Sequence, residues 1–168
     1  MHLNLETIKL ARGAHSADSG QACVMELCAC LAGESWSDSP KCVSPVIAAF
    51  LRNWNDGLPD DERHILKELV PDVMNTATGA ADDLTRSWMA MDWMIRAYTP
   101  AWLDLAGLGK RADAIRQGAA IVDSVTLAEA MPALIEGRKD ADAAGAAARA
   151  AARAAAWAAA RAAAGDAA

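Results

Sequence analysis

The C-terminal segment, residues 141–164, is almost entirely alanine and constrains the fold more than any other part of the chain. Alanine has the highest intrinsic helix propensity, so we expect one helix about 35 Å long at a rise of ~1.5 Å per residue. Large side chains recur there at every fourth position, on one stripe: Arg149, Arg153, Trp157 and Arg161. We interpret the segment as a structural or oligomerising helix, with an Arg/Trp surface for an acidic partner or nucleic acid as the alternative.

The rest of the chain has the composition of a helical protein. Its 168 residues are 54% apolar, yet they include a single Phe and a single Tyr against six Trp and seven Met. Alanine is abundant and β-branched residues are sparse, which favours helices over sheets. We therefore predict an all-α, single-domain bundle of five to seven helices over residues 1–140, followed by an Ala/Arg-rich helical tail over residues 141–168.

Charge and hydropathy restrict the partners and the compartment. The formal net charge of −6 argues against nucleic acid as a partner, because nonspecific binding relies on neutralising phosphates with Lys and Arg. Glu6 and Lys9 interrupt the segment where a signal peptide needs an apolar run, and no run of about 18 apolar residues follows. The sequence predicts a cytoplasmic protein without a membrane partner, whose cysteines are reduced.

Apolar spacing and capping residues predict the helices of the body. Asp18 or Ser19 is expected to cap a helix that ends before Gly33. Ser44 and Pro45 begin the next helix, which ends at Gly57. Further helices are expected over residues 60–73 with a break at Pro71, 81–98, 99–107, 110–117 and 126–136, the last disturbed by Pro132.

Residues 15–42 contain all four cysteines and are the best candidate for a site. His15, Cys23, Cys42 and either Asp38 or Glu26 offer the mixed N, S and O donors that zinc accepts, if the fold brings them together. The segment has no CxxC pair, so the spacing alone does not decide whether zinc is bound.

Cys23 supports a second interpretation. In the first turn of its helix it would meet free backbone N–H groups and the positive end of the helix dipole, which lower the pKa of a thiol. Gln21 could then support an oxyanion, and His15 or His64 could act as the base. The alternative is that the cysteines are buried packing residues.

A third interpretation concerns the polar residues of the same region. In it, Glu26, Ser37, Asp38 and Asn55 are helix caps and loop-tying hydrogen-bonding groups rather than ligands of a metal or substrate.

The segment CVMELCACLAGESWSDSPKCVSP, continuing into FLRNWNDGLPDDER, resembles a family of small uncharacterised helical proteins from high-GC bacteria and their phages. The shared pattern is Cys, Met-Glu, Leu-Ala-Gly-Glu, Ser-Asp-x-Pro-x-Cys and Asn-Asp before Leu-Pro. The resemblance implies a shared polar set: Cys23, Glu26, Asp38, Cys42, Asn55 and Asp56. The candidate binding residues are accordingly Cys23, Glu26, Trp36, Asp38, Asn55 and Asp56.

The sequence contains no phosphate loop, dinucleotide fingerprint, HExxH or nucleophile elbow, and we name no catalytic residue. We expect a non-catalytic binding protein, such as a phage accessory factor that sequesters or inhibits a host protein or a small signalling ligand. The alternatives are a thiol- or zinc-dependent hydrolase centred on Cys23 and an acidic mimic of nucleic acid. A homo-oligomer formed through the C-terminal helix is a further expectation.

Overall fold

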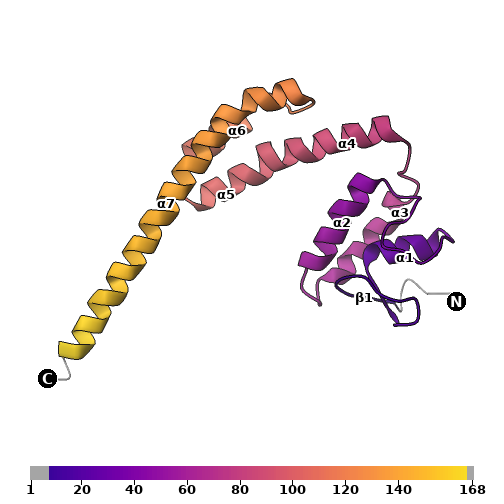
Figure 1. The fold of residues 1–168 in the computed structure, drawn as a ribbon, viewed down its shortest axis with the longest axis horizontal. Helices are drawn as coiled ribbons and strands as arrows, with labels where there is room; N and C mark the ends of the chain where they lie inside the picture. The colour runs from indigo at the N-terminus through magenta and orange to yellow at the C-terminus, as the bar shows by residue number, and fades with distance from the viewer. Residues whose placement is uncertain (1–7, 166–168) are drawn as a thin grey trace. The chain divides into compact units, whose positions relative to one another are not determined.

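The computed structural model describes residues 8–165, and the side chains of residues 8–154. The fold is all-α with a long Ala-rich C-terminal helix, as the composition predicts (Figure 1). The chain separates into two compact units, Met1–Ser87 and Trp88–Ala168, which are described one at a time. This division differs from the predicted one after residue 140, because residues on both sides of position 140 belong to one helix that packs within the second unit.

The first unit contains a short strand pair that the composition did not predict. Strands β1 (Lys9–Leu10) and β2 (Gln21–Ala22) pair in parallel, with Leu10 opposite Ala22. Leu10 and Ala22 are buried while Lys9 and Gln21 are exposed, so the pair follows the alternation of a half-buried strand. The pairing fixes both ends of the loop of residues 11–20.

Helix α1 (Val24–Leu31) begins later than the sequence predicts, so the expected cap at Asp18 or Ser19 is wrong. Cys23 is the N-cap, because β2 keeps the preceding two residues extended. Cys23 and Glu26 form a capping box, in which each accepts from the backbone N–H of the other. The predicted end at Gly33 is confirmed, since its φ of 71° is the left-handed conformation that terminates helices.

Helix α2 (Pro45–Gly57) confirms the predicted start and end. Its buried face carries Ala48, Leu51 and Asn55, whereas Phe50 and Trp54 are largely exposed and their rings contact each other at 5.9 Å. The buried face of α2 therefore includes a polar residue, Asn55.

The predicted break at Pro71 is also confirmed. A 3-10 helix, η1 (Arg63–Leu69), gives way to the single α-helical turn α3 (Val70–Val73), with Pro71 in its first turn. The core of the unit joins both strands to α1, α2, η1 and α3 and is formed by Ile8, Leu10, Ala22, Cys23, Val24, Met25, Leu27, Cys28, Val43, Ala48, Leu51, Leu66 and Val70.

The second unit is built on consecutive helices. Helix α4 (Ala80–Trp93) crosses the boundary between the units and continues as a π-helix, η2 (Met94–Tyr98), then α5 (Thr99–Leu105), α6 (Gly109–Arg116) and α7 (Ser124–Gly165). Ile95, Leu103, Ala112, Ile115 and Ile121 form its core.

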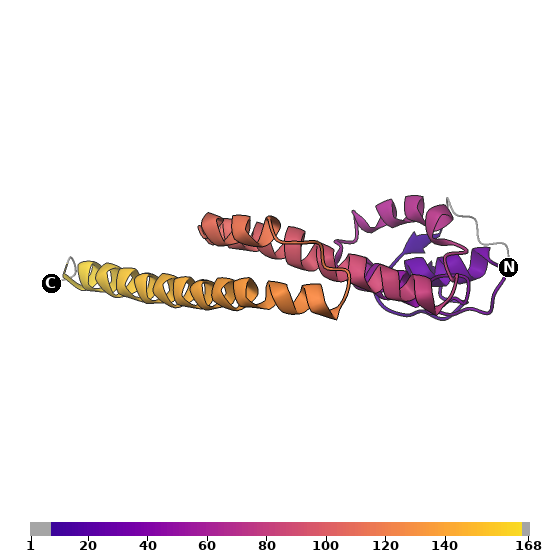
Figure 2. The same cartoon turned by 90° about the horizontal axis from the view of Figure 1, so that it is seen from above.

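Helix α7 continues through Pro132, so the proline does not end it (Figure 2). Leu127, Ala130 and Leu134 pack on the core of the unit on both sides of the proline, and this packing holds the helix through the missing hydrogen bond. The Ala-rich segment continues the same helix, with Arg149 and Arg153 exposed. The side chains of Trp157 and Arg161 lie outside the described residues.

Within residues 8–165, no helix is both long enough and apolar enough to cross a membrane.

Candidate functional site: polar side chains that hold the loop of residues 11–20

The loop of residues 11–20, here called the anchored loop, connects the two paired strands. The backbone N–H of Ala11 donates to the carbonyl of Ala22 at 2.9 Å and extends the strand pairing. The side chains of Arg12 and Ala14 are exposed, and so are residues 16–20. A loop with exposed side chains would ordinarily be mobile, so the contacts that fix its backbone are informative.

Glu26 provides one of these contacts from a buried position, with a relative exposure of 1%. Its carboxylate accepts from the backbone N–H of His15 at 2.6 Å and lies 3.1 Å from the ring Nδ1 of His15. It also accepts from the backbone N–H of Cys23 at 2.7 Å. A buried carboxylate requires such donors, and here they join the anchored loop to the start of α1.

Asn55 and Asp56, near the end of α2, hold the first part of the loop. The amide nitrogen of Asn55 donates to the carbonyl of Ala11 at 2.9 Å, and its oxygen accepts from the backbone N–H of Val24 at 3.3 Å. Asp56 accepts from the backbone N–H of Gly13 at 2.9 Å, and this hydrogen bond is the main reason that the pKa of Asp56 is lowered.

Trp36 completes the set, since its indole N–H donates to the carbonyl of His15 at 2.6 Å. The structure thus directs Glu26, Trp36, Asn55 and Asp56 toward the backbone of residues 11–15. The loop-tying role that the sequence offered for Glu26 and Asn55 is the role that their hydrogen bonds show.

Cys23 is not an activated thiol. Burial raises its pKa to about 11, and this outweighs the lowering effect of the hydrogen bond from the backbone of Glu26. The predicted lowering of this pKa at the helix N-terminus is therefore wrong. The thiol is 3% exposed and its sulfur accepts from the N–H of Glu26, so Cys23 caps α1 and fills the core.

Asp38 and Cys42 lie in the loop that follows α1. The carbonyl of Asp38 accepts from Arg52 Nη1 at 2.9 Å, and its carboxylate accepts from the Ser39 hydroxyl at 3.1 Å. The backbone N–H of Cys42 donates to Glu34 at 2.8 Å.

The structure does not bring the four predicted metal ligands, His15, Cys23, Asp38 and Cys42, into one site. Among residues 8–154, no three His, Cys, Asp or Glu side chains are grouped so that they could hold a metal ion. The reason is that the ring of His15 and the backbone of Cys23 are both bound to Glu26, while Asp38 and Cys42 are held in a different loop.

The loop of residues 33–41 contains a feature that the sequence reasoning missed. Its odd-numbered residues, together with Glu34, line a hollow of about 500 Å³: Gly33, Ser35, Ser37, Ser39 and Lys41. Its even-numbered residues instead anchor the loop, through the hydrogen bonds of Glu34, Trp36 and Asp38 and the burial of Pro40. The spacing of the three serines at every second position is the signal that could have revealed this serine-lined hollow.

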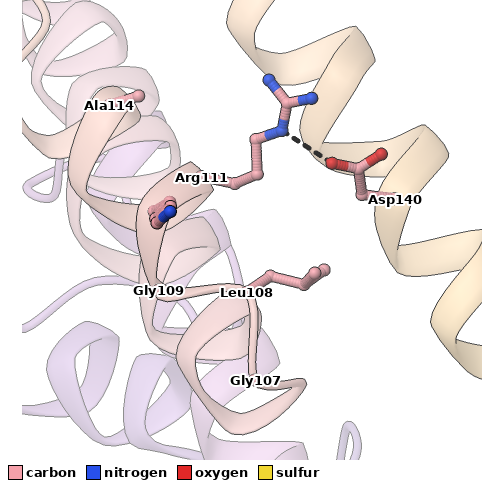
Figure 3. Close-up of a pocket in the computed structure, with 7 residues that line it drawn as sticks. Gly107, Leu108, Gly109, Arg111, Ala114 and Asp140 are labelled. Atoms are coloured by element: carbon pink, nitrogen blue, oxygen red, sulfur yellow. Dashed lines mark hydrogen bonds and ion pairs between the residues drawn. The ribbon is translucent and has the colours of Figure 1, made fainter.

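The second unit has a larger hollow, of about 610 Å³, between the start of α6 and helix α7 (Figure 3). Arg111 extends from α6 toward α7, where its Nε donates to Asp140 at 2.7 Å and its Nη2 lies 3.5 Å from Glu136. The charge of Arg111 is thus used to join two helices.

The same unit exposes aromatic side chains at the end of α4, on η2 and on α5. Tyr98 contacts the rings of Trp93 and Trp102 at 5.4 and 6.1 Å, and Trp102 is 58% exposed. The π-helical turn places Trp93 and Tyr98, five residues apart, on the same side.

Comparison of the chain with protein-family models, curated proteins and solved structures found no match. The fold and the site therefore give the class of protein: it is an all-α protein in which polar side chains, the buried Glu26 and Asn55 among them, hold an exposed loop.

Proposed function

We propose that this is a non-catalytic binding protein that recognises a partner protein with its anchored loop. The observation that carries the proposal is the convergence of Glu26, Trp36, Asn55 and Asp56 on the backbone of residues 11–15. These bonds fix the first half of a loop in which Arg12, Ala14 and residues 16–20 are exposed. A loop that is already fixed before binding loses less conformational entropy on association, which is expected of a recognition loop.

The chemistry of the site favours binding over catalysis. Glu26 uses both carboxylate oxygens to hold His15 and Cys23, and the raised pKa of Cys23 keeps its thiol protonated near neutral pH. The exposed residues of the loop include Arg12, Ser16 and Asp18, which suit a polar protein surface.

The resemblance to phage proteins supports the further proposal that the partner is a host protein. The proposed compartment is the cytoplasm, where the four free cysteines would remain reduced. We also propose α7 as the surface for any self-association, since Arg149 and Arg153 are exposed on a segment of small side chains.

The test places a photo-crosslinking amino acid at Ala14 of the full chain, which is expressed in the bacterial host in which the partner is sought. A matched probe at Asp72, exposed on α3 of the same unit, controls for random collisions. We expect one identified protein to crosslink from position 14 and not from position 72. The purified partner should bind the wild-type chain and lose about tenfold in affinity with Trp36→Phe, which removes the indole donor to His15.

Equal crosslinking from both positions would contradict the proposal. So would a partner that binds Trp36→Phe as tightly as the wild type, provided that circular dichroism shows the same helix content for both chains.

A further inference from the structure

We propose that the serine-lined hollow of residues 33–41 binds a small oxyanion, with a phosphate group as its best ligand. The hollow belongs to the first unit and uses side chains that take no part in holding the anchored loop. Its volume of about 500 Å³ is within the usual range of small-molecule sites, about 300–1,000 Å³.

The carboxylates at the hollow already accept hydrogen bonds from the loop itself. The two carboxylate oxygens of Glu34 accept from the backbone N–H groups of Lys41 and Cys42, at 2.6 and 2.8 Å. These bonds are part of the reason that the pKa of Glu34 is lowered, the first being its largest cause. The carboxylate of Asp38 beside the hollow accepts from the Ser39 hydroxyl.

The donors, in contrast, are available. Among the described side chains, no hydrogen bond of the Ser35 hydroxyl and no hydrogen bond or salt bridge of the Lys41 ammonium group is formed, and the charge of Lys41 acts on Glu34 only as a weaker contribution to its lowered pKa. Ser37 uses its oxygen to accept from the N–H of Ser39 at 3.0 Å, which leaves its hydroxyl proton free to donate. A hollow whose carboxylates already accept hydrogen bonds, and whose hydroxyls can still donate, matches a ligand that consists of acceptors.

Two cations lie at the hollow. Lys41 lines it, and Arg52 Nη1 approaches the Ser39 hydroxyl at 3.4 Å. Lys41 lies close enough to Glu34 to contribute to the lowered pKa of that carboxylate, and Arg52 Nη1 also donates to the backbone carbonyl of Asp38 at 2.9 Å. A phosphate in the hollow could therefore receive charge-assisted hydrogen bonds from Lys41 and Arg52, together with hydroxyl donation from Ser35 and Ser37.

The test is a titration of the full chain with inorganic phosphate at constant ionic strength, followed by amide chemical shifts. We expect saturable shifts confined to residues 33–41 and Arg52. Lys41→Met should raise the dissociation constant for phosphate at least about tenfold, because one charge-assisted hydrogen bond is lost. Lys110→Met removes the same charge from an exposed lysine of the second unit and should leave the constant unchanged.

Several outcomes would overturn the proposal. One is an equal loss in Lys41→Met and Lys110→Met, which would mean nonspecific attraction. Others are the absence of saturation, or saturation by glycerol or acetate without saturation by phosphate. Ser37→Ala keeps every charge and should weaken phosphate binding about threefold, so an unchanged constant would also count against the site. The result is independent of the anchored loop, because crosslinking from Ala14 reports on a different surface.

Discussion

Glu26 and His15 are eleven residues apart, yet the carboxylate of Glu26 accepts from the backbone of His15 at 2.6 Å and lies 3.1 Å from its ring. His15, considered from the sequence as a candidate base, is thus joined to Glu26 in a contact that holds the loop. This contact also explains why one carboxylate can be 1% exposed without a charged Lys or Arg beside it in the described hydrogen bonds.

Glu26→Ala is expected to destabilise the first unit by about 3 kcal/mol, because the N–H groups of His15 and Cys23 would lose their buried acceptor. Glu26→Gln keeps one acceptor oxygen and should cost less. Urea denaturation, followed by circular dichroism, measures the free energy of unfolding. Glu68→Ala, at an exposed position of η1, is the control and should change it by less than about 0.5 kcal/mol. If Glu26→Ala matches this control, the carboxylate does not hold the loop.

Acid should weaken the anchored loop through Asp56. The pKa of Asp56 in the folded protein is below its ordinary value of 3.8, chiefly because it accepts from the N–H of Gly13. A lowered pKa stabilises the fold above the unfolded value and loses that stabilisation as the pH falls through the folded value. The free energy of unfolding should therefore decrease below about pH 4, and less steeply in Asp56→Asn. Parallel curves for both chains between pH 6 and pH 2 would refute this contribution.

The four cysteines should differ in reactivity. Burial raises the pKa of Cys23 to about 11 and that of Cys28 to about 12, so neither forms much thiolate at pH 8. Cys30 and Cys42 are partly exposed, and burial together with Glu34 raises the pKa of Cys42. Iodoacetamide at pH 8 should modify Cys30 first, Cys42 more slowly, and the other two after denaturation. Peptide mapping by mass spectrometry gives the order, and early modification of Cys23 would contradict its buried position.

Gly137 tests the packing of α7. It is buried against α5 and α6, where an added Cβ would lie 3.4 Å from Leu103 and 3.5 Å from Ile115, at ordinary contact distance. Gly137→Ala should stabilise the second unit by up to about 1 kcal/mol, the difference in helix propensity. Gly137→Leu should destabilise it by about 1–3 kcal/mol through overpacking. Thermal unfolding ranks the three chains, and a stable Gly137→Leu would show that α7 does not pack closely here.

Local signals in the sequence predicted the helix boundaries well. Pro45, Gly57, Pro71 and Gly33 act within one or two turns of the chain, so their effects do not depend on distant residues. The continuity of α7 through Pro132 shows the opposite case, where packing on both sides overrides a local preference.

The start of α1 was missed although its signal is present. Cys23 and Glu26 have the spacing of a capping box, but cysteine is not among the usual capping residues, and Asp18 and Ser19 are. The strands before it are two residues long, too short for an alternation to be recognised.

The hydrogen-bond partners of Asn55 and Asp56 could not be predicted from the sequence, for a different reason. Asn55 and Asp56 reach Ala11 and Gly13 across more than forty residues, and only the tertiary fold specifies that pairing. The sequence indicated these polar side chains as candidates, and the fold shows that they hydrogen-bond to the backbone of the anchored loop.

Along residues 33–41, the residues that hold the backbone alternate with the residues that line the hollow. The even-numbered residues determine where the backbone lies, while Ser35, Ser37 and Lys41 determine what the hollow offers to a ligand. Substitutions at Ser35 and Lys41, whose side chains form, among the described residues, no hydrogen bond that holds the loop, can therefore change ligand preference at little cost in stability. The loop is for this reason a suitable place for selection, or for a protein engineer, to introduce a new specificity.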